Sequence, residues 1–235
     1  MAREIFDNYV EVSFDGHEQA VFKFDQFTLN YKQYFPADRS LPVLDIGIGR
    51  GEMLTCMRNW GLPYQGVDIS PSTVRFCQSL GLKCDHVDDT ADWLRSHRGE
   101  FALITCLDVL EHVPRDSTID FLKAIRTGLS PGGVAIVQVP NLQSPFGYLH
   151  HFNDFTHVSG FVEHSLGQVL LAAGFTNFEF HGFEDIYYRG VKASIRKALR
   201  FVLRRAVRFM RLVNGNPNPA ILDPVLYVVA RRPAG

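Results

Sequence analysis

The chain has 235 residues, of which 46% are hydrophobic and 21% charged, a composition typical of one soluble globular domain with a full core. Its net charge of -1 excludes a globally basic nucleic-acid binder. That sum hides a division, since residues 1–188 carry 13 Lys and Arg against 24 Asp and Glu, whereas residues 189–235 carry 11 against one. A local cationic element that faces an anionic partner is therefore expected near the C-terminus.

Neither disulfides nor membrane-spanning helices are expected. The four cysteines lack C-x-x-C spacing and are too few to cross-link a chain of this length, which predicts reduced, buried thiols in a cytosolic protein. The N-terminal segment is acidic and lacks the apolar stretch of a signal peptide, and no run approaches the roughly 18 apolar residues that a transmembrane helix needs. We expect a cytoplasmic protein.

Short apolar runs alternate with amphipathic segments, a pattern that predicts an α/β fold with a mostly parallel sheet. Residues 1–40, which are rich in aromatic side chains, are expected to form a helical lid on that sheet. Strands are predicted at 42–46, 64–68, 83–87, 101–106, 134–139, 177–181 and 225–230. Helices are predicted at 52–60, 71–80, 91–98, 116–129 and 163–173. The turn residues Ser130–Gly133 are expected to end the helix at 116–129.

The first predicted strand runs into the sequence LDIGIGRGE, with Gly47, Gly49 and Gly51 at a strand-to-helix turn. Glycines allow a sharp turn and bring backbone amides close to a ligand. The spacing differs from the GxGxxG of dinucleotide-binding sites, because Glu52 occupies the position of the third glycine, and an acid there would repel a pyrophosphate. No GK[ST] sequence follows, which excludes a P-loop.

Acidic residues mark the ends of the first three predicted strands. Asp45, just before the glycines, suits a ligand that carries a positive charge. Asp68, at the end of the second strand, is placed to accept hydrogen bonds from both hydroxyls of a ribose. Asp88 and Asp89, after the third strand, are placed to accept from an adenine amino group. This combination predicts a site for a nucleoside that carries a sulfonium amino acid.

The motifs LDIGIGRG, GVDIS, VDDTADWL, FALITCLDVLEHVP and LSPGGVAIVQVPN resemble, in order and spacing, those of class I S-adenosylmethionine-dependent methyltransferases over residues 41–181. The resemblance implies a Rossmann-like sheet of seven strands in the order 3-2-1-4-5-7-6, with the last strand antiparallel and helices on both faces. The residues it implies for S-adenosylmethionine are Asp45, Gly47, Ile48, Gly49, Asp68, Ile69, Asp88, Asp89, Cys106 and Leu107. Of these, Cys106 and Leu107 would offer backbone groups near the sulfonium.

We expect one methyltransferase domain over residues 1–235. Within it, the parts are the lid at 1–40, a cofactor-binding core at 41–182, an insertion at 183–223, and the last strand with a tail at 224–235.

Two segments hold the candidate catalytic residues. The sequence CLDVLEHVP contains Asp108, Glu111 and His112, which share a face if the segment is helical. A loop-like stretch after the fifth strand adds Asp154 and His157. In one interpretation, His112 or His157, oriented by a carboxylate such as Asp154, is the general base for a hydroxyl. In a second, Mg²⁺ or a similar ion lowers the pKa of the hydroxyl, and its ligands are Asp108, Glu111, His112 and His157. In a third, Glu111 and His112 have only a structural role.

The acceptor is suggested by further resemblances. The Asp-x-x-Glu-His pattern with a later Pro-Asn and His is similar to metal-dependent ubiquinone-pathway O-methyltransferases and to small-RNA terminal 2′-O-methyltransferases, in which Glu stands where this chain has Asp108. The stretch VPN…NDFTHVSGFVEHSL…LLAAGF resembles bacterial methyltransferases of cell-surface polysaccharide assembly. The expectation is an O-methyltransferase for a sugar hydroxyl of a cell-surface or lipid-linked glycan. The alternatives are a small lipophilic acceptor such as a quinone, and the ribose of RNA; no DNA partner is expected.

Residues 191–213, inside the insertion, are predicted to form a basic amphipathic helix. The segment has eight Lys and Arg and no acid, and its apolar residues recur every three or four positions. Three interpretations are open: a core helix with a solvated cationic face, a helix on an anionic membrane surface, or a clamp for phosphate. The second places the protein on the inner face of the plasma membrane.

Overall fold

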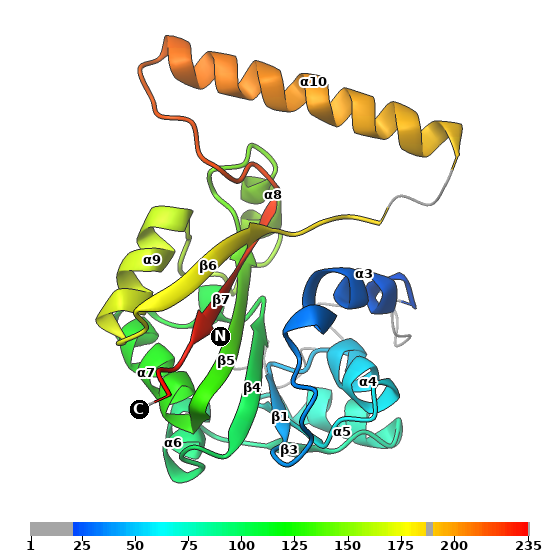
Figure 1. Cartoon of the computed structure of the whole chain (residues 1–235), viewed down its shortest axis with the longest axis vertical. Helices are drawn as coiled ribbons and strands as arrows, with labels where there is room; N and C mark the ends of the chain where they lie inside the picture. Colours follow the sequence, from blue (N-terminus) through cyan, green and yellow to red (C-terminus); the bar gives the residue numbers. More distant parts are fainter. Residues whose placement is uncertain (1–20, 187–189, 235) are drawn as a thin grey trace.

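The computed structural model describes residues 21–186 and 190–234. These residues form a seven-stranded sheet in the order β3-β2-β1-β4-β5-β7-β6, covered by helices on both faces (Figure 1). Strand β7 is antiparallel to both of its neighbours, and the other neighbouring pairs are parallel. The predicted fold class and strand order are therefore confirmed.

The strands follow the predicted positions closely, with one exception. Their bounds are β1 (Val43–Ile46), β2 (Tyr64–Asp68), β3 (Cys84–His86), β4 (Phe101–Leu107), β5 (Leu129–Pro140), β6 (Asn177–Gly182) and β7 (Val225–Arg231). The helix predicted at 116–129 ends before Ser130–Gly133 as expected, but β5 begins earlier than the predicted residue 134. Leu129 already pairs with Phe101, so these residues lie within β5, whose register shifts between Phe101 and Leu103.

Helices cover both faces of the sheet, and those that come first along the chain share one face. On one face lie α3 (Val21–Tyr31), α4 (Glu52–Asn59) and α5 (Pro71–Ser79), and on the other α6 (Thr90–Ser96), α7 (Thr118–Gly128) and α9 (Glu163–Ala172). Because side chains alternate along a strand, Leu44 of β1 enters the core under the second set and Val43 the core under the first. The four cysteines are buried and unpaired, as predicted.

The predicted lid is described only in part, since residues 1–20 lie outside the described residues. The remainder consists of α3 and a 3₁₀ turn at Lys32–Tyr34. Phe27 and Tyr31 of α3 are buried in the core, and the Tyr31 hydroxyl donates a hydrogen bond to Oε1 of Gln138 in β5. This bond and the aromatic contacts attach α3 to the sheet.

Most strands of the sheet end at one edge, where two further helices are attached. All strands except β7 run in the same direction, so their carboxyl ends share this edge. Helix α8 (Gly147–Phe152) follows β5, and α10 (Val191–Val213) connects β6 to β7, so both are attached there. Helix α10 lies away from the body of the molecule (Figure 1). None of the helices in the described residues has both the length and the apolar character needed to cross a bilayer.

Candidate active site

The turn after β1 is built from three glycines with left-handed backbone. Gly47, Gly49 and Gly51 have φ of 72°, 50° and 74°, and Gly51 caps the start of α4. A Cβ atom on Gly47 would overlap the Cγ2 atom of Val109, which follows β4. Glycine is therefore required at position 47 both for the conformation and for the close approach of the two loops.

Replacing Gly47 with alanine is expected to weaken S-adenosylmethionine binding by at least about tenfold and to lower the melting temperature, because strain and overpacking each cost roughly 1–3 kcal/mol. Gly81→Ala is the matched control: Gly81 also has a positive φ, 69°, but a Cβ there meets nothing within 4 Å. Calorimetric titration and thermal unfolding of both variants measure the difference. Equal behaviour of the two variants would show that the contact with Val109 does not shape the site.

Two carboxylates, the buried Asp45 and the partly buried Asp68, lie next to this turn. Oδ1 of Asp45 accepts a hydrogen bond of 2.6 Å from the Thr105 hydroxyl, and burial raises the Asp45 pKa to about 8. Asp68 accepts from the backbone N–H of Ile48 at 2.9 Å with one oxygen and from that of Ser70 at 2.8 Å with the other. Burial raises the Asp68 pKa to about 6, against the lowering effect of these bonds. Asp68 thus ties the loops after β1 and β2 together, and each oxygen keeps a lone pair for a ribose hydroxyl.

A cavity of about 650 Å³ opens above the turn at the carboxyl edge of the sheet. The sequence-predicted residues that line it are Asp45, Gly47, Ile48, Gly49, Asp68, Ile69, Asp88, Asp89, Leu107, Asp108 and His112. Cys106 is absent from this lining, because its side chain is fully buried in the core. Asp89 also caps α6, where it accepts from the backbone N–H of Asp92 at 2.8 Å.

The charge of this cavity fits a cationic nucleoside. Eight carboxylates line it against two basic side chains, Lys23 and Arg95. S-adenosylmethionine carries a sulfonium and an ammonium group, so a cavity with this surplus of negative charge favours it. The glycine turn, the carboxylates at three strand ends and the size of the cavity together fit this cofactor.

The segment after β4 is not the predicted helical face. Asp108 has φ of 54°, and among the described residues it is the only non-glycine residue with a positive φ. A short 3₁₀ helix, Leu110–His112, follows it. The carboxylate of Asp108 accepts from Nε2 of Gln138 at 2.8 Å, and it is not part of the cluster formed by Glu111 and its neighbours. The expectation that Asp108 shares a helical face with Glu111 and His112 is therefore wrong, since Asp108 itself has a left-handed backbone.

Glu111, His112 and His157 come together beside the cavity, with one donor atom from each within 4.8 Å of the others. The Glu111 side chain is fully buried, and neither of its carboxylate oxygens has a hydrogen-bond partner among the described residues. Its Oε1 lies 3.8 Å from Nε2 of His157. Burial raises the Glu111 pKa well above its ordinary value, and the nearby Asp108 charge adds to this effect. A buried carboxylate without a partner is costly and points to a group that the polypeptide does not supply.

Outer contacts orient both imidazoles of this cluster. The Thr156 hydroxyl donates to Oδ1 of Asp154 at 2.6 Å, so it must accept the bond of 2.8 Å from Nδ1–H of His112. Nδ1–H of His157 donates to the carbonyl of His151 at 2.7 Å. The neutral His157 ring therefore keeps the lone pair on Nε2. Burial and the nearby His157 lower the His112 pKa to about 4, which keeps this ring neutral.

The residues Glu111, His112 and His157 fit a divalent metal ion. Two imidazole nitrogens and one carboxylate form a common ligand set for a catalytic ion with open positions. The bonds from Thr156 and His151 are the second-sphere contacts that such imidazole ligands generally have.

The sequence analysis missed three residues whose side chains hold predicted site residues in place. Thr156 links Asp154 to His112, Gln138 holds Asp108, and Thr105 holds Asp45. Only Thr156 had a local signal, because an Asp-x-Thr sequence favours the turn in which the Thr156 N–H donates to Asp154 at 2.8 Å. The other two contacts depend on strand pairing in the finished sheet.

Comparisons with known sequences agree with this site. A sequence model described as a methyltransferase domain matches residues 20–179. The ubiquinone biosynthesis O-methyltransferase of Psychrobacter arcticus is 30% identical over 115 residues, which are 46% of this chain and 43% of that protein. The enzyme of the same name from Shewanella pealeana is 32% identical over 104 residues, which are 42% and 43% of the two chains. The chain spans less than half the length of these curated relatives.

Solved structures share the fold at lower sequence identity. A SAM-dependent methyltransferase from Archaeoglobus fulgidus superposes with a TM-score of 0.70 at 19% identity, over 97% of this chain and 99% of that one. The 1,6-didemethyltoxoflavin-N1-methyltransferase of Burkholderia thailandensis, solved with S-adenosylhomocysteine, has a TM-score of 0.60 at 18% identity, over 99% and 88%. The family match over residues 20–179 shows that the chain belongs to the methyltransferase domain family, and its seven-stranded sheet has the strand order expected for class I members.

Proposed function

We propose that the protein is an O-methyltransferase whose acceptor is a hydroxyl of a lipophilic, quinone-type molecule. The observation that carries this proposal is the cluster of Glu111, His112 and His157, in which His112 also lines the cofactor cavity. S-adenosylmethionine, when bound, supplies a methyl group on a sulfonium, which is already a good leaving group. What the protein must add is to orient the acceptor and remove its proton.

His112 alone is a poor base for this task. Its pKa is about 4, whereas a phenolic hydroxyl has a pKa near 10. A gap of about six pKa units corresponds to roughly 8 kcal/mol against proton transfer. Of the interpretations of this cluster, metal binding is therefore favoured over His112 as a lone base.

A divalent ion held by Glu111, His112 and His157 would supply Lewis acidity, which lowers the pKa of a nearby hydroxyl. The three residues bring one negative charge and two neutral nitrogens, and the bond from Nδ1 of His157 to the His151 carbonyl orients the His157 ring. This set is more typical of Mn²⁺ or Zn²⁺ than of Mg²⁺, which prefers oxygen ligands. The Mg²⁺ expected from the sequence is thus replaced in this proposal by a softer divalent ion.

Thr156→Val tests the positioning of His112. Loss of the bond to Nδ1 of His112 is expected to reduce Mn²⁺ affinity by about 10–100-fold while the melting temperature stays nearly constant. Thr156→Ser should restore binding, and Thr127→Val is the control, since the exposed Thr127 hydroxyl bonds only a helix carbonyl. Mn²⁺ titration followed by electron paramagnetic resonance measures the affinities. Unchanged affinity in Thr156→Val would contradict this role.

The choice of acceptor departs from the sequence analysis, which favoured a glycan hydroxyl. The curated relatives that the chain matches are ubiquinone biosynthesis O-methyltransferases, and they favour the quinone alternative. Exposed apolar side chains of the α8 segment, residues 141–158, support a lipophilic acceptor. They are Phe146, Tyr148, Leu149, Phe152, Phe155 and Val158.

An acceptor panel tests the proposal. The protein is incubated with S-adenosylmethionine, Mn²⁺ and, separately, a prenylated catechol, a lipid-linked glycan and a short RNA, and products are read by mass spectrometry. The expected product is the catechol with one added methyl on oxygen. A methylated glycan or RNA with an unmodified catechol would replace the proposed acceptor.

A further inference from the structure

Helix α10 turns its apolar side away from the rest of the protein. Its apolar residues, spaced by three or four, are all exposed: Val191, Ile195, Leu199, Val202, Phe209, Met210 and Val213, each at 54–77%. Val207 is the only residue of α10 that is buried. This is the reverse of an ordinary surface helix, in which the apolar stripe faces the core. The interpretation of α10 as a core helix with a solvated cationic face is therefore wrong.

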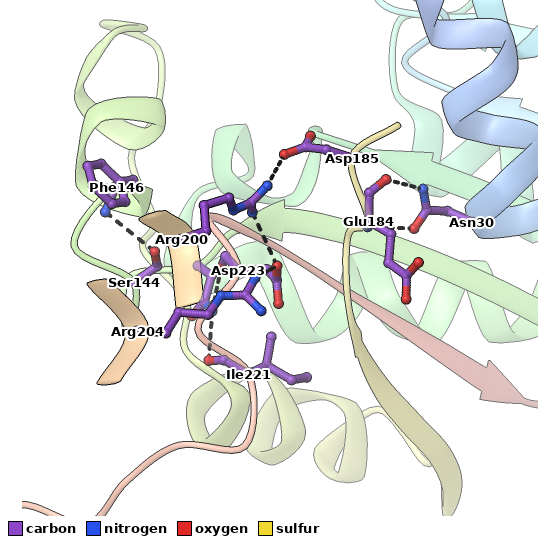
Figure 2. A network of polar contacts seen from close by, with 10 residues as sticks. Asn30, Ser144, Phe146, Glu184, Asp185, Arg200, Arg204, Ile221 and Asp223 are labelled. Atoms are coloured by element: carbon purple, nitrogen blue, oxygen red, sulfur yellow. Dashed lines mark hydrogen bonds and ion pairs between the residues drawn. The ribbon is translucent and has the colours of Figure 1, made fainter. Parts of the chain in front are cut away.

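The contacts of α10 with the body are polar. Arg200 forms ion pairs with Asp185 and Asp223, the latter at 3.5 Å, and Arg204 also pairs with Asp223 (Figure 2). Arg211 donates to the carbonyl of Pro217 at 2.9 Å. These arginines lie on the side of the helix opposite the apolar stripe. The ion pairs fix the rotation of α10 about its axis. Because the paired arginines point toward the body, the apolar stripe on the opposite side points outward.

Further cations flank the apolar stripe. At 100° per residue, Lys192 and Arg196 fall along one border of the stripe, and Arg205 along the other. No acidic residue occurs in α10. Long basic side chains beside an apolar stripe can extend toward phosphates while the stripe enters an apolar phase.

The position of α10 relates this surface to the active site. Asn141, where the α8 segment begins, donates to the carbonyls of Ile221 and Asp223 at 3.3 and 2.9 Å. The α8 segment is thus joined to the chain that returns from α10, and Asp223 in turn pairs with the arginines of that helix. Both exposed apolar elements belong to the carboxyl edge of the sheet, where the cofactor cavity lies.

We propose that α10 docks the protein on an anionic phospholipid membrane, with the apolar stripe in the interface and the flanking cations on lipid phosphates. Eight cations without an acid in 23 residues match an anionic surface. A second copy of the chain would fit less well, because two such helices would bring like charges together. Docking by this edge turns the cavity toward the bilayer, where a lipophilic acceptor would reside. Docking does not depend on the identity of the acceptor and can be tested without activity.

Vesicle flotation of the full chain tests this inference. We expect binding to vesicles of phosphatidylcholine with phosphatidylglycerol, little binding to phosphatidylcholine alone, and a loss of at least about tenfold at high salt. The double variant Leu199→Ser, Phe209→Ser should bind at least about tenfold more weakly. Leu171→Ser is the control, since Leu171 is equally exposed but lies on α9. Thermal unfolding and S-adenosylmethionine affinity should not change in either variant.

Two outcomes would overturn the inference. One is equal flotation on neutral and anionic vesicles, or none on either. The other is a concentration-dependent dimer in lipid-free solution that the Leu199→Ser, Phe209→Ser variant abolishes, which would assign the apolar stripe to a second copy. Failure of methyl transfer to the catechol with intact vesicle binding would contradict the proposed acceptor and leave the docking surface standing.

Discussion

Replacing Glu111 with glutamine is expected to lower kcat for O-methyl transfer by about 10²–10⁴-fold while the melting temperature of the metal-free protein stays the same or rises. The carboxylate is fully buried without a hydrogen-bond partner among the described residues, so removing its charge breaks no hydrogen bond to another described residue. Its loss removes the only anionic member of the cluster with His112 and His157. Steady-state kinetics and thermal unfolding measure both effects.

Glu100→Gln serves as the control, because Glu100 is exposed and precedes β4, whereas the cluster follows the other end of that strand. It should leave kcat, the melting temperature and S-adenosylmethionine affinity unchanged. The affinity for S-adenosylmethionine should also survive in Glu111→Gln, since Glu111 does not line the cofactor cavity. A variant that keeps full activity, or one that loses activity only because it unfolds, would remove Glu111 from the mechanism.

Replacing Asp45 with asparagine is expected to weaken S-adenosylmethionine binding and to stabilise the cofactor-free protein at alkaline pH. A hydrogen bond to a charged group contributes about 1.5–3 kcal/mol, so Kd should rise roughly 10- to 100-fold. The asparagine oxygen can still accept the bond from Thr105, which preserves the local structure. Calorimetric titration gives Kd, and thermal unfolding gives the stability. A Kd within twofold of the wild-type value would exclude a charged contact between Asp45 and the cofactor.

The pH dependence of the same pair of proteins provides a second readout. The Asp45 pKa is about 8 when folded and ordinarily near 3.8, so the folded state holds this proton more tightly and stability falls as pH rises toward 8. A cationic cofactor needs the ionised carboxylate, so its Kd should fall by up to about tenfold per pH unit until pH reaches 8. Asp45→Asn should lose both dependences, whereas the exposed control Asp25→Asn should keep them. Identical pH profiles in all three proteins would contradict the role of Asp45.

The fold was predictable because its signals are local and repeated. Strands β1, β4, β5 and β7 contain short apolar runs, and each helix after β1, β2 and β3 begins next to a residue suited to that position, such as Gly51, Ser70 or Asp89. The sheet order followed from the resemblance to class I methyltransferases. The acids at three strand ends reach one cavity because parallel strands share their carboxyl edge.

The residues outside the cofactor cavity were less predictable, because their arrangement depends on the left-handed backbone of Asp108 and on contacts between positions distant in sequence. Asp108, Glu111 and His112 have helical spacing, but that spacing does not reveal the left-handed residue at Asp108. The bond between Thr156 and His112 joins positions 44 residues apart. Such a contact is set by how the loop after β5 crosses the end of β4, which no local pattern encodes.

Helix α10 shows what an amphipathic sequence pattern cannot predict. Its amphipathic pattern predicted a helix, and the residues of α10 are those predicted. The pattern alone could not say which side meets the body, because that depends on ion pairs from Arg200 and Arg204 to acids outside the helix. The sequence left open whether the apolar stripe meets the body or an outside surface, and these ion pairs turn it outward.

The central claim, that the cluster of Glu111, His112 and His157 drives methyl transfer to oxygen, is tested most directly by one rate. Transfer of labelled methyl from S-adenosylmethionine to a prenylated catechol is measured after exhaustive chelation and again after Mn²⁺ is added. We predict that transfer stops on chelation, returns with Mn²⁺ in the wild-type protein and does not return in Glu111→Gln. An unchanged rate in the chelated protein, or equal recovery in the variant, would contradict the account.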